Sequence, residues 1–372
     1  MLQIDWGYYS LILNFDIRRR FFHLEKKKKK RFLFAFRSLI RNFAHMNEEL
    51  FRTIVPLPKA PFHIGAAEQV LCIGSCFADE IGRRFQDDHF PTVANPFGVM
   101  YNPASILHTI QSLPRPLQKE GRHAINDEYC NASPPYGGGA GGGATLAILT
   151  LGTNHVYIDR ATNKIVDNCQ KRPASDFEER VLSVDECADY LLRSIQLLYE
   201  WNPEMKIILT VSPIRYRKYG YHESQLSKAT LLMAVEKVAP TPNPTQREGS
   251  LASFAADNGA SNANQAPLPL GWTGDALLYF PSYEILLDEL RDYRFYAPDM
   301  LHPSPQAVDY IYRRFQDCFF SDEARQYVSE WRPIREALAH RPFNPDSSEY
   351  QTFRKQTLQR QQAFEQKWHK RE

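Results

Sequence analysis

Residues 69–78 read QVLCIGSCFA, an apolar run that stops at a glycine and resumes after a serine and a cysteine. A short apolar run that ends at Gly74 is typical of a buried strand that delivers the chain into a tight turn. We therefore expect a strand over 69–73 and a helix after the turn. This order would place Ser75 at the junction between strand and helix.

The same alternation continues along the chain. Segments with helical periodicity separate or follow the strands that we expect. Strands that alternate with helices predict an α/β fold, in which helices cover both faces of a parallel sheet. The further strands are expected at 145–151 and 206–211, a hairpin at 156–158 and 165–166, and the helices at 103–113, 184–200, 226–239 and 281–292.

Two stretches interrupt this pattern. Residues 136–143 hold six glycines in eight positions, and 240–272 is rich in Pro, Asn, Ala, Gly and Ser. Both are typical of flexible surface insertions. The glycines do not form a P-loop, because no Gly-Lys-Ser/Thr follows them. We expect one catalytic domain over 46–345 and a helical tail over 346–372.

The charge of the chain is unevenly distributed. The 372 residues contain 45 Lys and Arg against 43 Asp and Glu, a net charge of +2. Eleven basic and three acidic residues give 1–45 a net charge of +8, so the remainder carries −6. Composition changes at Met46, and our hypothesis is that 1–45 is a basic extension outside the translated protein. A net charge of −6 disfavours nucleic acid and anionic membranes as partners.

Several other classes of protein are disfavoured by composition. With 43% hydrophobic and 24% charged residues, the chain can bury a sizeable core. The basic clusters follow the first apolar stretch, which is the reverse of a secretory signal, and no apolar run approaches the ~20 residues of a membrane span. Six scattered cysteines without a C-x-x-C pair indicate neither zinc nor a disulfide framework. We expect a cytoplasmic protein.

Ser75 is the first candidate catalytic residue. At the carboxyl end of a parallel strand, its side chain would face the crevice where α/β folds bind ligands. The free N–H groups of the following helix could receive a developing oxyanion. The structural alternative is an ordinary N-cap, since serine is favoured at that position.

A second candidate group is the segment DMLHPSP, residues 299–305. Asp299 can accept the Nδ1–H of His302, which would leave Nε2 free to take a proton from a serine. Ser304 and Pro305 are explained as the N-cap and first residue of a helix. A surface aspartate beside a histidine at the edge of the core would look the same in sequence.

The order of these residues resembles that of the SGNH (GDSL-type) hydrolase superfamily, with the serine before the Asp-x-x-His pair. Within it, residues 74–78, GSCFA, match the signature of the GSCFA-domain family. The resemblance covers roughly residues 46–320. Further matching segments are Asn95-Pro96-Phe97-Gly98, Tyr101-Asn102-Pro103, Thr150-Leu151-Gly152-Thr153, residues 210–215, residues 226–229 and residues 279–304.

The resemblance implies a three-layer α/β/α sandwich and acyl transfer from an ester to water or to another hydroxyl. Ser75 would be the nucleophile, His302 the general base and Asp299 the residue that orients the imidazole. Gly98 and Asn154 would complete the oxyanion hole, although His155 stands where an aspartate is expected. Asn154 could instead be a turn residue. No metal or organic cofactor is needed, and the expected substrate is an acylated carbohydrate or another cell-surface polymer precursor.

Other assignments remain open at this point. Cys76 could be the nucleophile in place of Ser75, or the fold could serve as a non-catalytic binding module. Asn102 and Lys228 are candidate substrate-binding residues, and the alternative for Lys228 is a solvated charge on a helix. An aromatic cluster ahead of Asp299 could stack on a sugar ring or belong to the core, and it comprises Tyr279, Phe280, Tyr283, Tyr293, Phe295 and Tyr296. The oligomeric state is not predicted.

Overall fold

The computed structural model describes residues 53–113, 143–167, 169, 172–239 and 276–368. One compact unit of the chain starts at Val55. The extension 1–45 and the insertion 240–272 lie outside the described residues, as does the insertion 136–143 apart from Gly143. The domain boundaries at 46 and 346 stay predictions.

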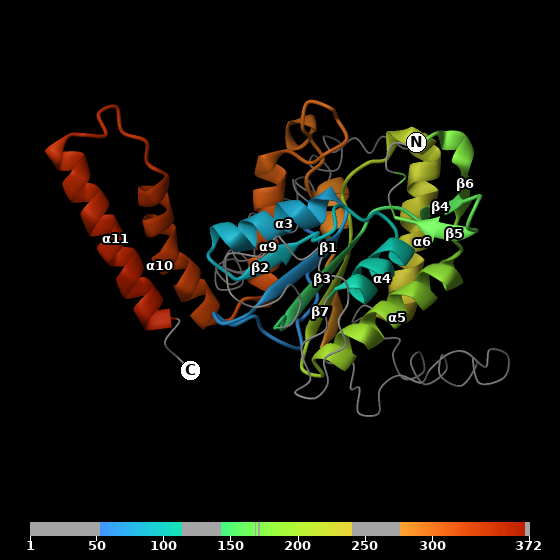
Figure 1. Ribbon diagram of the computed structural model, residues 1–372, viewed down its shortest axis with the longest axis horizontal. Helices are drawn as coiled ribbons and strands as arrows, with labels where there is room; N and C mark the ends of the chain where they lie inside the picture. Colours follow the sequence, from blue (N-terminus) through green and yellow to red (C-terminus); the bar gives the residue numbers. More distant parts are fainter. Residues whose placement is uncertain (1–52, 114–142, 168, 170–171, 240–275, 369–372) are drawn as a thin grey trace, which may run out of the picture. The chain divides into compact units, whose positions relative to one another are not determined.

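A five-stranded parallel sheet forms the centre of this unit (Figure 1). Its strands follow the order β2-β1-β3-β7-β8, and every neighbouring pair is parallel. The predicted strands therefore lie next to one another in the middle of the sheet. The bounds are β1 Val70–Gly74, β2 Thr92–Ala94, β3 Leu146–Leu151, β7 Lys206–Val211 and β8 Leu277–Tyr279.

Side chains alternate between the two faces of this sheet, as a strand requires. In β1, Leu71 and Ile73 enter one hydrophobic cluster, and Val70 and Cys72 enter the other. The first cluster includes α4 Pro103–Ser112, α5 Val184–Trp201 and α6 Tyr221–Val238. The second includes α3 Cys76–Asp87, α9 Pro305–Phe319 and the π-helix Ile285–Glu289, which directly follows the short α8 Ser282–Glu284. Helices on both faces confirm the predicted three-layer α/β/α fold.

A smaller antiparallel sheet follows β3. It has the order β5-β4-β6, with β4 His155–Asp159, β5 Lys164–Val166 and β6 Phe177–Val181. The pairing of Tyr157 with Val166 confirms the predicted hairpin. Short 3-10 turns complete the connections at Ala174–Asp176, Arg217–Tyr219 and Tyr293–Phe295.

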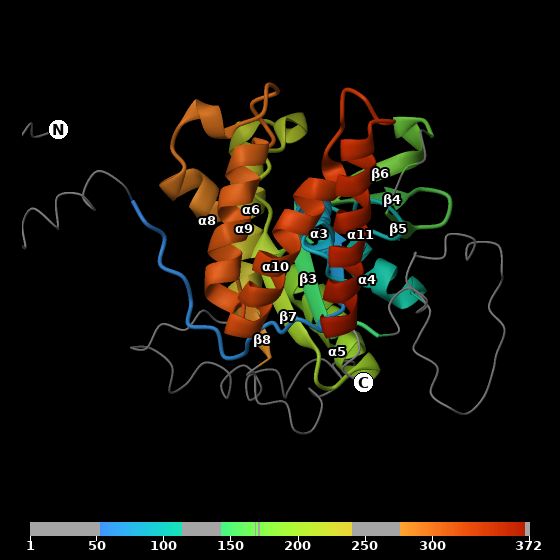
Figure 2. The same cartoon turned by 90° about the vertical axis from the view of Figure 1, so that its left-hand side faces the viewer.

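The C-terminal region is helical, as predicted. Helix α10 Asp322–Ala339 packs against α11 Ser348–Trp368 through aromatic rings, and Figure 2 shows the two helices side by side. Phe364 of α11 lies 5.2 Å from Trp331 and 4.9 Å from Tyr327 of α10, measured between ring centroids. Trp331 in turn stacks on His89, so α10 is fixed to the end of α3.

Two expectations about helices need correction. Helix α6 begins at Tyr221, earlier than the predicted 226, because Gly220 at φ +82° starts it and its first turn is polar. The segment 281–292 forms one short helical turn and a π-helix rather than a continuous α-helix. Among the described helices, none combines the length and hydrophobicity that a membrane span requires.

Candidate active site

Ser75 lies where β1 passes into α3. Gly74 has φ +144°, and a Cβ at this position would lie 2.1 Å from the carbonyl oxygen of Thr150, so only glycine fits the turn. Ser75 N donates to the same carbonyl at 3.0 Å. Its Oγ accepts from Phe77 N at 3.3 Å, and the residue is fully buried. In this structure Ser75 is thus the N-cap of α3.

Cys76 is more accessible than Ser75. It is half-buried, and its Sγ lies 3.6 Å from the Tyr101 hydroxyl. Burial, followed by the hydrogen bond to Cys76, raises the pKa of Tyr101 to about 12, so the phenol remains protonated at neutral pH. Cys76 therefore stays in consideration as a nucleophile.

Asp299 and His302 form the pair that their spacing suggested. Asp299 Oδ2 lies 2.6 Å from His302 Nδ1, and Oδ1 accepts from the backbone N–H groups of Leu301 and His302. These backbone hydrogen bonds, and then the imidazole, hold the pKa of Asp299 at about 2. An ionised carboxylate can only accept, so Nδ1 carries the proton and the neutral ring has Nε2 free as a base.

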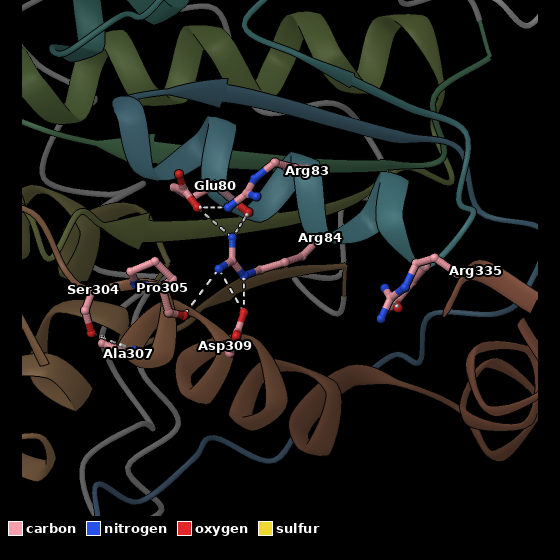
Figure 3. Close-up of polar contacts among 9 residues, drawn as sticks. Glu80, Arg83, Arg84, Ser304, Pro305, Ala307, Asp309 and Arg335 are labelled. Atoms are coloured by element: carbon pink, nitrogen blue, oxygen red, sulfur yellow. Dashed lines mark hydrogen bonds and ion pairs between the residues drawn. The ribbon is translucent and has the colours of Figure 1, made fainter. Parts of the chain in front are cut away.

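Arg84 connects the helix that follows Ser75 with the helix that follows His302 (Figure 3). The residue is 7% exposed, and its guanidinium donates to the Asp309 carboxylate at 2.9 Å and to the Pro305 carbonyl at 3.4 Å, both on α9. It also donates to the backbone carbonyl and the carboxylate of Glu80 on α3, at 2.9 and 2.6 Å. A planar fork of five N–H donors can make all these bonds at once, which a lysine cannot.

No hydrogen bond joins Ser75 to His302 within the described part of the chain. Both residues nevertheless belong to elements on the same face of the sheet, since α3 and α9 share one hydrophobic cluster. The loop of His302 is also tied to the end of β7, because Arg215 N donates to Leu301 O at 3.0 Å.

Gly98 lies on the exposed loop after β2 and has φ +93°. Its N–H donates to Asn95 O at 2.8 Å. The Asn95 side chain accepts from Gly74 N at 2.8 Å and donates to Asp79 at 2.7 Å, so it fastens this loop to the turn of Ser75. The sequence contained this motif, but its spacing alone did not reveal the role of Asn95.

The side chain of Asn154 reaches the residue that follows β6. Its side-chain amide donates to Leu182 O at 2.7 Å, and the residue is 2% exposed. Gly152 is the residue of this segment that reaches the site, because a Cβ there would lie 3.4 Å from Ser75 Cβ and 3.0 Å from Tyr101 O. The oxyanion roles of Gly98 and Asn154 stay predictions.

Asn102 has a structural partner of its own. It is the N-cap of α4, is buried, and accepts from Ser105 N at 2.9 Å. Its role in binding substrate stays a prediction.

Lys228 is buried, so the alternative of a solvated helix charge is wrong. Its Nζ donates to Gly152 O at 2.6 Å and to Ser212 O at 2.8 Å, at the ends of β3 and β7. Burial, and then the nearby Arg215, lowers the pKa of Lys228 to about 7. This lysine fastens the two strand exits together beneath the candidate site.

The aromatic cluster ahead of Asp299 divides into core and surface. Tyr279, Phe280 and Tyr283 are buried, whereas Tyr293 is 81% exposed. Most of the cluster around β8 therefore packs in the protein and offers no open ring face.

Groups of acidic, histidine and cysteine side chains that could hold a metal ion are not found among the described residues. No curated protein matches the chain. Its structure is similar to a solved structure from Streptococcus pneumonia that is provisionally described as a platelet activating factor, with 17% identity and a TM-score of 0.36 over 68% of this chain and 86% of that chain.

Two family models match the sequence. The model described as the GSCFA family covers residues 69–135, 140–248 and 270–315, more than half of the chain. The model described as the C-terminal domain of GSCFA domain proteins covers residues 331–370, which include all of α11. This confirms the family that the motif at 74–78 predicted: the chain belongs to the GSCFA family.

Proposed function

We propose that this protein is a serine-dependent acyl-ester hydrolase or O-acyltransferase of the SGNH (GDSL-type) superfamily. Ser75 is the nucleophile, His302 the general base and Asp299 the residue that orients the imidazole. The observation that carries the proposal is the Asp299–His302 pair, in which the free Nε2 belongs to a ring fixed by a 2.6 Å hydrogen bond.

The reaction requires Ser75 to leave its capping position. The bond from Phe77 N to Ser75 Oγ is long, at 3.3 Å, so a change of rotamer costs little. Oγ then attacks the ester carbonyl carbon while its proton passes to His302 Nε2. The tetrahedral intermediate expels the alcohol, which takes that proton. Water or an acceptor hydroxyl attacks the acyl-serine by the reverse sequence, and Ser75 is regenerated.

The first N–H of α3, that of Cys76, is the simplest oxyanion donor. The first N–H groups of a helix have no acceptor within the helix, and they carry its positive end. Gly98 and Asn154 are the further candidates, and each would have to release its present acceptor, Asn95 O or Leu182 O. Loss of one such donor costs roughly 3 kcal/mol of transition-state stabilisation.

An acylated carbohydrate or a cell-surface polymer precursor is the substrate class that we propose. Exposed aromatic rings flank Gly98, with Phe97 43% and Tyr101 36% exposed. Aromatic faces of this kind stack on sugar rings. The acyl group and the acceptor are not specified by these residues.

A second candidate mechanism uses Cys76 as nucleophile. The observation that favours it is the greater exposure of Cys76 beside a fully buried Ser75. Treatment with a fluorophosphonate and with iodoacetamide separates the two mechanisms, because the first reagent reacts with activated serines and the second with thiols. Labelling of the thiol alone, with loss of activity, would assign the reaction to Cys76.

A panel of short p-nitrophenyl esters tests the proposed function. Wild type and Cys76→Ala should release p-nitrophenol, and Ser75→Ala and His302→Ala should be nearly inactive. Full activity in Ser75→Ala would exclude the serine mechanism. If no ester is cleaved and no serine is labelled, the fold is a binding module.

A further inference from the structure

Arg215 is a half-buried arginine whose side chain has no ion pair or hydrogen bond among the described residues. A charge that is partly removed from water is normally paired, because its desolvation is otherwise uncompensated. The other buried or half-buried arginines of the described chain follow this rule. Their partners are Asp309 for Arg84, Glu186 for Arg180, Glu289 for Arg314 and Asp88 for Arg335.

The position of Arg215 places it at the candidate active site. It follows β7 in the loop at the carboxyl end of the sheet, where parallel folds bind ligands. Its backbone N–H donates to Leu301 O at 3.0 Å, within the loop of Asp299 and His302. The neighbouring strand, β3, ends at Leu151, and the next residue, Gly152, packs against Ser75.

Lys228 lies near Arg215 and adds to the positive potential when it is protonated. Lys228 is close enough for the arginine to act on its ionisation, and both of its acceptors are uncharged carbonyl groups. The positive charge of Arg215 also acts to lower the pKa of Tyr283, against the larger effect of burial, which raises it. The acid of the adjoining loop, Asp299, is already bound to His302. Arg215 is therefore the permanent positive charge at this edge of the site, Lys228 adds to it when protonated, and neither is paired with a carboxylate among the described residues.

We propose that Arg215 binds an anionic group of the substrate, a carboxylate or a phosphate, and so restricts the enzyme to acyl esters that carry a negative charge. This inference rests on the proposed function of Ser75. The planar guanidinium can donate two parallel N–H bonds to such a group, and Lys228 adds to the attraction when it is protonated. Hydrogen bonds between charged groups in a partly buried site would make the preference large.

Matched esters test this preference. For the carboxylate, p-nitrophenyl acetate is compared with p-nitrophenyl hemisuccinate; for the phosphate, 6-O-acetylglucose is compared with its 1-phosphate. We expect Arg215→Met to lower kcat/KM for the preferred anionic ester roughly 10- to 100-fold, mainly through KM, and to leave the neutral ester within about twofold. Arg215→Lys should fall between. Arg217→Met is the control, because Arg217 is an exposed arginine two residues away.

Binding measured without turnover separates this inference from the proposed function. The dissociation constant of the anionic ester is measured for Ser75→Ala and for Ser75→Ala with Arg215→Met. Weakening of roughly 10- to 100-fold in the double variant supports the anion site whether or not wild type cleaves the ester. Equal affinity for anionic and neutral esters, or an equal loss of both in Arg215→Met, would overturn it. Absence of cleavage alone would count against the proposed function.

Discussion

Replacement of Arg84 by methionine tests whether this residue positions His302 relative to Ser75 or only stabilises the fold. The change keeps an apolar stem between α3 and α9 and removes every donor that joins Glu80 to Asp309 and to the Pro305 carbonyl. The two carboxylates that remain have side chains 63% and 40% exposed, so water can hydrate them. Arg84→Met should therefore lower the free energy of unfolding by about 3 kcal/mol, which is less than the loss expected for a deeply buried ion pair. This corresponds to a fall in Tm of roughly 4–5 °C for a unit of this size.

The effect of this change on turnover should exceed its effect on folding at room temperature. The N-terminus of α9 follows His302 by three residues, and it would no longer be held at a fixed distance from the helix that Ser75 caps. A displacement of about 1 Å in such a site can lower the rate by about 10²-fold. Circular dichroism melts and ester turnover, measured well below Tm, give the two quantities independently.

Arg83→Met is the matched control for Arg84. Arg83 is the preceding residue of the same helix, pairs with the same Glu80, and has a side chain 55% exposed. A surface pair of this kind contributes at most about 1 kcal/mol, so both Tm and kcat should stay near wild type. If Arg84→Met has a lower Tm than Arg83→Met but the same kcat, the hydrogen bonds of Arg84 stabilise the fold without positioning His302.

Three further changes probe the site and the sheet. Asp299→Asn should lower kcat by about 10²- to 10⁴-fold, because the role of Asp299 is to hold the proton of His302 on Nδ1. Its Tm should stay near wild type, because the side chain is exposed. Ester turnover and a thermal melt measure the two quantities, and an unchanged kcat would exclude the orienting role. Lys228 has a folded-state pKa of about 7 against 10.5 unfolded, so the unfolded chain binds more protons between these values and stability should rise with pH across that window. Urea unfolding at pH 7 and pH 10 should show this rise, on the order of a few kcal/mol, in wild type, and Lys228→Met should abolish it; parallel curves for both proteins would contradict the assignment. Gly74→Ala places a methyl group against the Thr150 carbonyl, so the variant should be unfolded or inactive. Circular dichroism and ester turnover of the expressed protein measure this. A normal melt and normal turnover would show that the turn can relax.

The central strands could be predicted from sequence because each buries both faces. Strands β1, β3 and β7 are continuous apolar runs, and this is the pattern of a sheet covered on both sides. The edge strands β2 and β8 have three residues each, too few for such a run to stand out. In β6, the sequence FEERV is largely exposed, so hydrophobicity does not mark it.

In the candidate site, contacts between residues close in sequence could be predicted, and contacts between distant residues could not. Asp299 and His302 are three residues apart, so their pairing followed from spacing and side-chain chemistry. The Arg84–Asp309 contact joins residues 225 positions apart, and only the packing of α3 on α9 creates it. Lys228 could not be recognised as buried, because its acceptors are backbone carbonyls at the ends of two separate strands.

The most direct test of the account is the site and rate of fluorophosphonate labelling, followed by mass spectrometry of the peptide that contains residues 74–78. We predict an adduct on Ser75 in wild type and in Cys76→Ala. The rate should fall by about 10²- to 10⁴-fold in His302→Ala, because the serine would lose its base. A protein that forms no serine adduct while alkylation of Cys76 abolishes ester cleavage would contradict the proposal that Ser75 is the nucleophile.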